Sequence, residues 1–303
     1  MVHHYYVVDV FAERPYAGNQ LAVVIGTAGM TDETMQRVAA EMNFSETTFV
    51  APAREVDGGH RVRIFTPARE LAFAGHPVLG TAWVIRHHIS REAGDPILLN
   101  LATLQVQVTF EPSAAPPGEL AWFVGPPARL GATCARERVA AALGISSDDI
   151  DPSAPVQEVS AAASAIIVPV RGLEALRRSR LDLEAFAPIA REGFPPLVYL
   201  FCRETVDPQN DVCARFFFEA RGVREDPATG FGAALLGTYL LEHRLCHGPE
   251  LSLRIEQGHE IGRPSVLMLR ARMNDGIREV SVGGLVIPTM RGELLQPWRH
   301  ERA

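Results

Sequence analysis

The stretch that decides the fold is FTPARELAFAGHPVLGTAW, residues Phe65–Trp83. It starts at the end of a β-like run, passes through a glycine-bearing loop and enters a mostly apolar run, Val78–His87, that predicts a buried helix. His76 stands at this junction beside Gly75. A titratable ring placed where a helix begins is a candidate for chemistry, although a histidine that merely caps the helix is an equally good interpretation.

The chain contains a second copy of this plan. Arg63-Ile64-Phe65 leads to Leu79-Gly80-Thr81, and Arg215-Phe216-Phe217 leads to Leu236-Gly237-Thr238 through a slightly longer loop. Both copies run from strand to loop to buried helix, which favours two halves of one fold that face each other over chance similarity.

The flanking sequence supports an α+β fold. Strands are expected at His4–Val10, Leu21–Ile25, Thr47–Val50, Arg61–Phe65, Ile97–Leu101, Leu104–Phe110, Ala163–Val170, Leu197–Cys202, Arg215–Phe218, Leu251–Ile255, Ser265–Arg272 and Glu279–Val286. Helices are expected at Thr31–Met42, with Thr31 as N-cap, and at Val78–His87, Cys134–Leu143, Leu181–Glu192 and Gly232–His243.

The proline- and glycine-rich stretch Glu111–Leu120 is expected to link the two halves. The first half then covers residues 1–115 with Glu46 and His76, and the second covers residues 120–303 with Asp226. The last twenty or so residues either pack on the second half or cross back to the first.

Composition excludes several classes of protein. The 303 residues carry a net charge of −7 without a basic stripe, which argues against nucleic acid as a partner. The longest apolar runs fall short of the roughly 20 residues that span a bilayer. The start, MVHHYYVVDVF, has no basic n-region and is expected to be a strand and not a signal peptide. The four cysteines, Cys134, Cys202, Cys213 and Cys246, have no C-x-x-C spacing, so a cytoplasmic protein without a metal site or disulfide framework is expected.

The sequence contains no lysine, because all 29 of its Lys and Arg residues are arginine. A Schiff base needs an amine that can lose its proton, and a guanidinium does not. Lysine-dependent pyridoxal-phosphate enzymes, aldolases, kinases and Walker-A ATPases are therefore excluded.

Two buried helices that open from glycine-containing loops would present unpaired N–H groups to a shared cleft and hold an anionic substrate there. The loops offer His76 in the first copy and Glu225 and Asp226 in the second, and Glu46 stands at the mouth of an apolar β-like segment. Each has a plainer interpretation as well. Glu46 is equally explained as an exposed strand start or a cap, and Asp226 as a turn-forming residue before Pro227.

Five ordered motifs identify a resemblance to the PhzF family, named for the phenazine-biosynthesis isomerase, over essentially the whole chain. They are D-V-F-x-x-x-P-x-x-G-N at Asp9–Asn19, N-F-S-E-T-T-F at Asn43–Phe49, F-T-P-x-x-E-L-x-F-A-G-H-P at Phe65–Pro77, E-D-P-A-T-G at Glu225–Gly230 and Q-G-x-x-x-G-R-P-S at Gln257–Ser265. The resemblance implies a fold similar to diaminopimelate epimerase: two similar halves, each a curved, mostly antiparallel sheet or barrel around a central helix, with the site between them.

The resemblance also implies roles for single residues. The family's acid–base glutamate corresponds to Glu46, its histidine to His76 and its aspartate to Asp226. Substrate contacts are implied at Asn19, Gly75, Thr229, Gly230 and Phe231. Phe231 departs from the family pattern, which usually has a serine there.

We therefore expect a cofactor-independent isomerase that moves a proton within a small carboxylate-bearing substrate, with Glu46 as the acid–base group, no metal, and a homodimeric assembly implied by the resemblance. A two-thiol racemase is disfavoured because no cysteine lies in either loop. The alternatives are a non-catalytic small-ligand binding protein on the same fold and a racemase or epimerase that uses one carboxylate.

Overall fold

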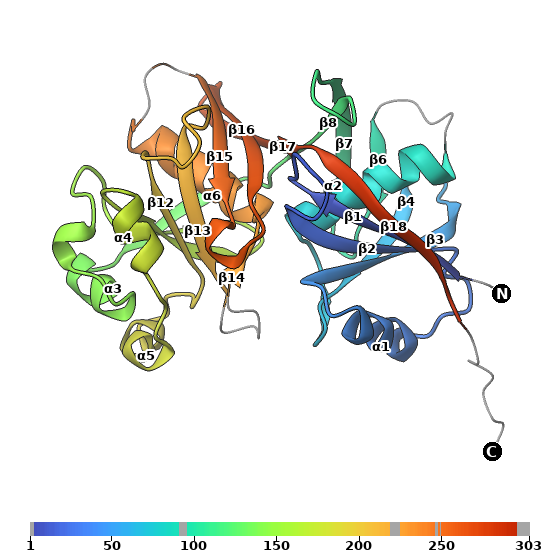
Figure 1. Cartoon of the computed structure of the whole chain (residues 1–303), viewed down its shortest axis with the longest axis horizontal. Coiled ribbons are helices and arrows are strands. Elements are labelled where there is room, and N and C mark those ends of the chain that lie inside the picture. Colours follow the sequence, from blue (N-terminus) through green and yellow to red (C-terminus); the bar gives the residue numbers. More distant parts are fainter. Residues whose placement is uncertain (1–2, 91–95, 219–224, 246–247, 249, 296–303) are drawn as a thin grey trace.

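The computed structural model describes residues 3–90, 96–218, 225–245, 248 and 250–295. These form two lobes side by side, with both ends of the chain at the lobe built from the first third of the sequence (Figure 1). The helices are α1 Asp32–Met42, α2 Gly75–Val84, α3 Arg136–Ala142, α4 Leu173–Arg178, α5 Leu183–Arg191 and α6 Gly230–Glu242, with a π-helical turn at Ile85–Ile89 and 3₁₀ turns at Ser147–Asp149 and His259–Ile261.

The strands of the described residues join into one continuous sheet. They are β1 His3–Val10, β2 Asn19–Ile25, β3 Glu46–Arg54, β4 His60–Phe65, β5 Glu70–Leu71, β6 Ile97–Asn100, β7 Gln105–Pro112, β8 Glu119–Val124, β9 Arg129–Thr133, β10 Gln157–Ser160, β11 Ser164–Pro169, β12 Val198–Cys202, β13 Val212–Phe217, β14 Glu225–Asp226, β15 Glu250–Gln257, β16 Ser265–Asn274, β17 Ile277–Gly284 and β18 Val286–Leu294.

Each lobe wraps its strands around one buried helix. In the first lobe α2 packs against β1, β2, β3, β6, β7, β8 and β18, and all ten of its residues are buried. In the second lobe α6 packs against β10, β11, β15, β16 and β17. A helix that is apolar all round is stable only inside such a core, and this explains why neither helix has a polar face.

The repeat seen in the sequence is a repeat of structure. Arg63 on β4 donates Nε and Nη2 to the two carboxylate oxygens of Glu70 on β5, each at 2.7 Å. Arg215 on β13 makes the same bidentate pair with Glu225 on β14, at 2.8 and 2.7 Å. Each guanidinium also lies over the phenylalanine ring two residues further along its strand, at 5.0 Å in the first lobe and 4.7 Å in the second. Each arginine thus fixes the short strand that leads into the loop before the central helix.

The chain crosses between the lobes at two places. The β8 strand pairs with β7 on one side and with β17 on the other. After β17 the chain passes into β18, which crosses back and pairs antiparallel with β1 from His3–Leu294 to Val10–Val286 (Figure 1). The final residues, 296–303, lie outside the described part.

The stretch Glu111–Leu120 does not link the lobes, and this prediction is wrong. It forms the end of the β7–β8 hairpin, in which Pro112 pairs with Glu119 and Phe110 with Ala121. Proline and glycine are typical of any turn, so their density marks a change of direction without saying what lies on either side. The division into halves at residues 115–120 stays a prediction, and it falls within this hairpin.

The helices and strands expected from the sequence are found to within a few residues of their expected bounds, whereas α4, β5, β8, β9, β10, β14 and β18 were not expected. Thr31 caps α1 as expected by accepting a hydrogen bond from the Thr34 amide. The α2 helix begins at Gly75, three residues before the expected start at Val78, because Pro77 is tolerated in a first helical turn where its missing N–H has no partner to lose.

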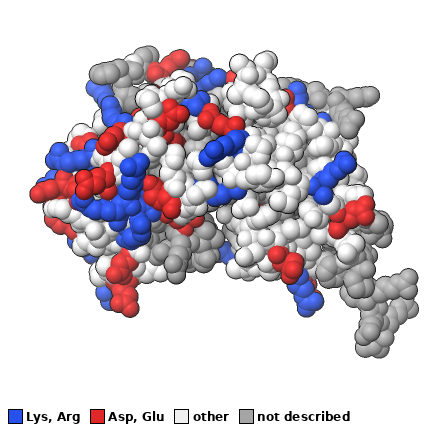
Figure 2. Space-filling model, in the orientation of Figure 1, with Lys and Arg blue, Asp and Glu red and all other residues white. Residues whose placement is uncertain are grey.

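No helix of the described residues is long and apolar enough to cross a membrane. Charged side chains gather over the second lobe, where α3, α4 and α5 lie, while the visible face of the first lobe carries few (Figure 2).

Candidate active site

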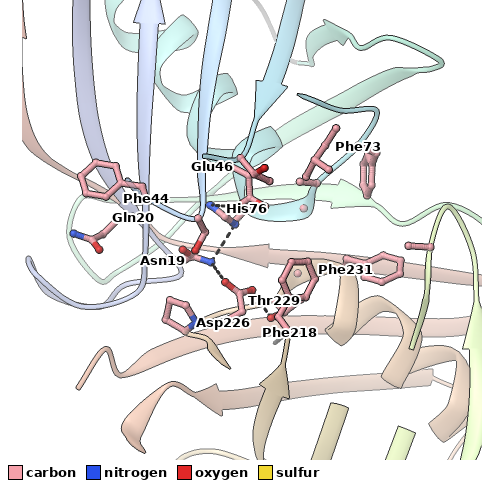
Figure 3. A pocket seen from close by; sticks show the side chains of 18 of the residues that line it. Asn19, Gln20, Phe44, Glu46, Phe73, His76, Phe218, Asp226, Thr229 and Phe231 are labelled. Carbon is pink, nitrogen blue, oxygen red and sulfur yellow. Dashed lines mark hydrogen bonds and ion pairs between the residues drawn. The ribbon is translucent and has the colours of Figure 1, made fainter. Parts of the chain in front are cut away.

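A cavity of about 730 Å³ opens where the two lobes meet. Both central helices start at its wall, and all eight residues expected at the site line it: Asn19, Glu46, Gly75, His76, Asp226, Thr229, Gly230 and Phe231. The first lobe supplies four of these residues and the second lobe supplies the other four (Figure 3). The residues expected at the site from the sequence thus line one cavity, whereas the location of the site and the roles of its residues stay predictions.

Glu46 is the first residue of β3. The preceding helix α1 ends at Asn43, whose left-handed conformation (φ 53°) turns the chain sharply toward the strand. The side chain is buried, with 8% of the residue exposed, and its Oε2 lies 3.4 Å from Nε2 of His76. The carboxylate thus faces the cavity from an otherwise apolar strand.

His76 occupies the second position of α2 and is 4% exposed. Burial lowers the pKa of its imidazole to about 3, since a charged ring would lose its hydration there. The ring is therefore neutral near pH 7 and carries a single proton. Its Nδ1 lies 3.1 Å from Nδ2 of Asn19 and its Nε2 faces Glu46, so the ring connects an amide and a carboxylate.

Asn19 joins the two lobes. It is the first residue of β2, and its Nδ2 donates hydrogen bonds to Oδ1 of Asp226 at 2.8 Å and to the carbonyl of Ala228 at 2.9 Å. These two acceptors belong to the loop before α6. One buried side chain of the first lobe therefore fixes the loop of the second.

Asp226 lies on β14 and is partly buried. Burial raises the pKa of its carboxyl to about 6, against hydrogen bonds from Thr229, Asn19 and Ser45, which favour the ionised form. An acid whose pKa lies near neutrality can hold or release a proton under ordinary conditions. The pKa values of Asp226 and His76 are thus moved in opposite directions.

Gln257 and Ser45 contribute to the site although no role was expected for either. Gln257 Nε2 donates to the backbone carbonyl of Asp226 at 2.8 Å, and its Oε1 accepts from the Thr229 amide at 3.3 Å. Gln257 opens the last of the five sequence motifs, which was the available signal.

The starts of α2 and α6 meet at the cavity. A Cβ added to Gly75 would lie 2.8 Å from the backbone nitrogen of Phe231, so only glycine permits this approach. Among the described residues no side chain caps either helix at Ala74 or Thr229. First-turn N–H groups without caps favour an anion at this point.

Glu225 is not available for acid–base chemistry. Its carboxylate forms the bidentate pair with Arg215, and 2% of the Arg215 side chain is exposed. The remaining nitrogen of Arg215 donates to the carbonyls of Leu176, Arg177 and Ser179 at the end of α4. The pair therefore anchors β14, which carries Asp226 as its next residue.

The cysteines lie apart from the cavity. Cys134, Cys202 and Cys213 are buried in a separate apolar cluster of the second lobe, and burial raises the pKa of each thiol. Cys246 lies outside the described residues. Within the described part of the chain, no three His, Cys, Asp or Glu side chains come together as a metal site would require.

Comparison with known proteins agrees with this architecture. The family model of the PhzC–PhzF phenazine biosynthesis-like proteins matches residues 8–292. The chain belongs to this family. It is 33% identical to an uncharacterized isomerase of Mesorhizobium japonicum, covering 96% of this chain and 98% of that protein. It is 32% identical to the trans-2,3-dihydro-3-hydroxyanthranilate isomerase of Pseudomonas chlororaphis, covering 97% and 100%.

Solved structures show the same fold. A PhzF-family protein of Bacillus anthracis superposes with a TM-score of 0.88 at 24% identity, covering 98% of this chain and all of that one. A Pseudomonas aeruginosa protein described as a predicted epimerase superposes with a TM-score of 0.80 at 31% identity, covering 97% and 100%. A hydroxyproline epimerase of Agrobacterium vitis, at 14% identity and TM-score 0.61, shares the fold over 97% of this chain and 91% of that one. The expected family, the two-lobed epimerase-like α+β fold and the isomerase class are confirmed.

Proposed function

We propose that this PhzF-family protein is a cofactor-independent isomerase that moves a proton within a small carboxylate-bearing substrate, with Glu46 as the acid–base group. The observation that carries the proposal is the convergence of Glu46 and His76 from one lobe and Asp226 from the other on one cavity. General acid–base catalysis needs such groups within reach of one substrate atom, and burial moves the pKa values of His76 and Asp226 away from those in water.

In this mechanism the ionised Glu46 takes a proton from an activated carbon of the substrate and becomes a carboxylic acid. It then delivers a proton, after exchange of its carboxyl proton with solvent, to the same carbon or to another carbon of the conjugated system, so that no proton is gained or lost overall. His76, neutral at this pH, donates or accepts a hydrogen bond beside Glu46. Asp226 supplies a second carboxyl group, which gains or loses a proton as the charge of the substrate changes.

The uncapped starts of α2 and α6 are the proposed binding place of the substrate carboxylate and of negative charge that develops in the transition state. Trans-2,3-dihydro-3-hydroxyanthranilate, named for the relatives in Pseudomonas, is one such acid and the first compound to test. The small anionic substrate and the homodimer stay predictions.

The proposal is tested by incorporation of solvent deuterium, followed by proton NMR. Trans-2,3-dihydro-3-hydroxyanthranilate and a panel of unsaturated and α-substituted acids are incubated in D₂O with the wild type and with Glu46→Gln. Label at a substrate carbon that is lost in a folded Glu46→Gln variant supports the proposal. Equal labelling by the variant, or none by the wild type on any acid that binds, refutes it and favours a non-catalytic binding protein.

Epimerisation by one carboxylate is a second candidate, because a relative that is 31% identical is described as an epimerase. The same experiment separates the two reactions. Deuterium at the original carbon with inverted stereochemistry identifies an epimerase, whereas deuterium at a different carbon identifies a proton-shift isomerase.

A further inference from the structure

Part of the cavity wall is built from large apolar side chains. This apolar wall consists of Leu71, Phe73, Leu104, Leu197, Phe218 and Phe231. Leu197 is buried, and the other five are partly buried against the main hydrophobic core. In Figure 3, Phe73, Phe218 and Phe231 lie together on one side of His76, while Asn19 lies on the other.

Several polar side chains that line the cavity are bound to protein partners. Asn19 donates its amide hydrogens to Asp226 and Ala228, and the Thr229 hydroxyl donates to Asp226. Arg263 also lines the cavity, and its Nε and Nη2 donate to Asp9 and to the carbonyls of Ala17 and Gly18. A ligand thus meets polar groups beside Glu46 and the helix starts, and carbon where it lies against Phe73, Phe218 and Phe231.

The two lobes differ in the residue that follows the glycine at the start of the central helix, which is Phe231 in the second lobe. It follows Gly230 at the start of α6, as His76 follows Gly75 at the start of α2. The repeated plan therefore places a polar ring in the first lobe and an apolar ring at the equivalent position in the second. A buried hydroxyl or amine of a ligand placed against Phe231 would have no partner there and would lose its hydrogen bonds to water.

The cavity has a volume of about 730 Å³. Pockets of this size bind ligands with substantial apolar area.

We propose that the substrate carries a bulky apolar group, aromatic or alicyclic, lodged against the apolar wall, and that Phe231 is the residue that selects for it. The inference rests on the proposed function only in placing the carboxylate end of the substrate beside Glu46 and the helix starts. It names a substrate class: carboxylic acids with a hydrophobic body.

The test measures binding by calorimetry with acetate, benzoate, 3-phenylpropionate and gluconate. Affinity is expected to rise from acetate to benzoate to 3-phenylpropionate, by about fourfold for each buried methylene equivalent, and gluconate is expected to bind no better than acetate. In Phe231→Ser the advantage of 3-phenylpropionate over acetate should fall at least tenfold, whereas Phe231→Leu should retain most of it.

Phe194→Ser serves as the matched control, because Phe194 packs on the separate cluster of the second lobe and not on the cavity. It should leave the affinity series unchanged. The proposal is overturned if 3-phenylpropionate binds no more tightly than gluconate to the wild type, or if Phe231→Ser keeps the wild-type series. If Phe231→Ser does not fold, the wild-type series and Phe231→Leu still decide.

Failure of this inference is distinguishable from failure of the proposed function. Apolar preference without deuterium exchange on any acid keeps the inference and refutes the isomerase. Deuterium exchange that depends on Glu46, together with no preference for apolar ligands, supports the isomerase and refutes the inference.

Discussion

Nε2 of His76 lies 3.4 Å from Oε2 of Glu46, and both side chains are almost completely buried. Because burial holds the pKa of His76 near 3, this contact is not an ion pair between imidazolium and carboxylate at neutral pH. It places a neutral ring beside a carboxyl group, so the ring can orient that group without bringing a charged imidazole into the core.

His76 is expected to stay neutral across the physiological range. Its ring ¹⁵N and carbon-bound proton shifts should not change between pH 5 and pH 8. A transition of the His76 resonances with a midpoint near 6.5 would contradict the structure.

Asp226 should make the protein less stable as the pH rises. The pKa of its carboxyl is 3.8 when unfolded and about 6 when folded, so between these values the folded state binds more protons. The free energy of unfolding should therefore fall by on the order of 3 kcal/mol from pH 4 to pH 7, relative to Asp226→Asn. Urea denaturation of both proteins at several pH values measures this. If the free energy of unfolding depended on pH in the same way for both proteins, the pKa of Asp226 would not be raised.

Removal of the Asn19 side chain should loosen the junction of the lobes. Asn19→Ala leaves the buried carbonyl of Ala228 without this donor and removes one from Asp226, which costs about 1–3 kcal/mol. The pKa of Asp226 should rise further, because the lost hydrogen bond favoured its ionised form. Gln20→Ala, at the neighbouring cavity residue, is the control and should change stability by less than about 0.5 kcal/mol.

The two arginine–glutamate pairs should differ in strength despite their equal geometry. Glu225→Gln leaves the almost fully buried Arg215 with only the more distant Glu260, at 3.8 Å, as a counter-charge, which should cost about 3 kcal/mol. Glu70→Gln removes a partner whose side chain is 37% exposed, so the cost should be about 1 kcal/mol or less. Equal losses in urea denaturation would show that solvent does not screen the Arg63 pair.

Gly75→Ala should damage the site more than the fold. The new methyl would press on the backbone nitrogen of Phe231 at 2.8 Å, and only movement of a helix start relieves this. Deuterium exchange should fall at least a hundredfold, because small displacements of catalytic groups are costly. In the control Gly131→Ala, the nearest atom is the end of a flexible Glu158 side chain, which can move aside. Full activity of Gly75→Ala would show that the helix starts do not position the substrate.

Local sequence signals predicted most of this molecule. The buried helices, their glycine loops and the repeated Arg-x-Phe strands follow from periodicity and residue type, and each was found within a few residues of its expected place. Even the early start of α2 reflects a local rule, the tolerance of Pro77 in a first turn.

Contacts between residues far apart in the sequence could not be predicted from such signals. Asn19 and Asp226 are 207 residues apart, and nothing in the spacing of either says that they meet. For the same reason the sequence suggested Glu225 as a possible acid–base group, whereas the structure pairs it with Arg215. The hydrogen bond from Gln257 to Asp226 was not expected either. The prediction that Glu111–Leu120 links the lobes was wrong for the same reason, since only strand pairing distinguishes a hairpin from a linker.

The return of β18 to the first lobe has a consequence for how the chain is made. During synthesis β1 emerges about 280 residues before β18, the strand that covers its outer edge. Until then the backbone of residues 3–10 presents unpaired N–H and C=O groups on that edge, the kind of edge on which other strands add and chains aggregate. The first lobe is thus begun before the second and completed after it, and a chain that ends before residue 286 would leave that edge permanently open.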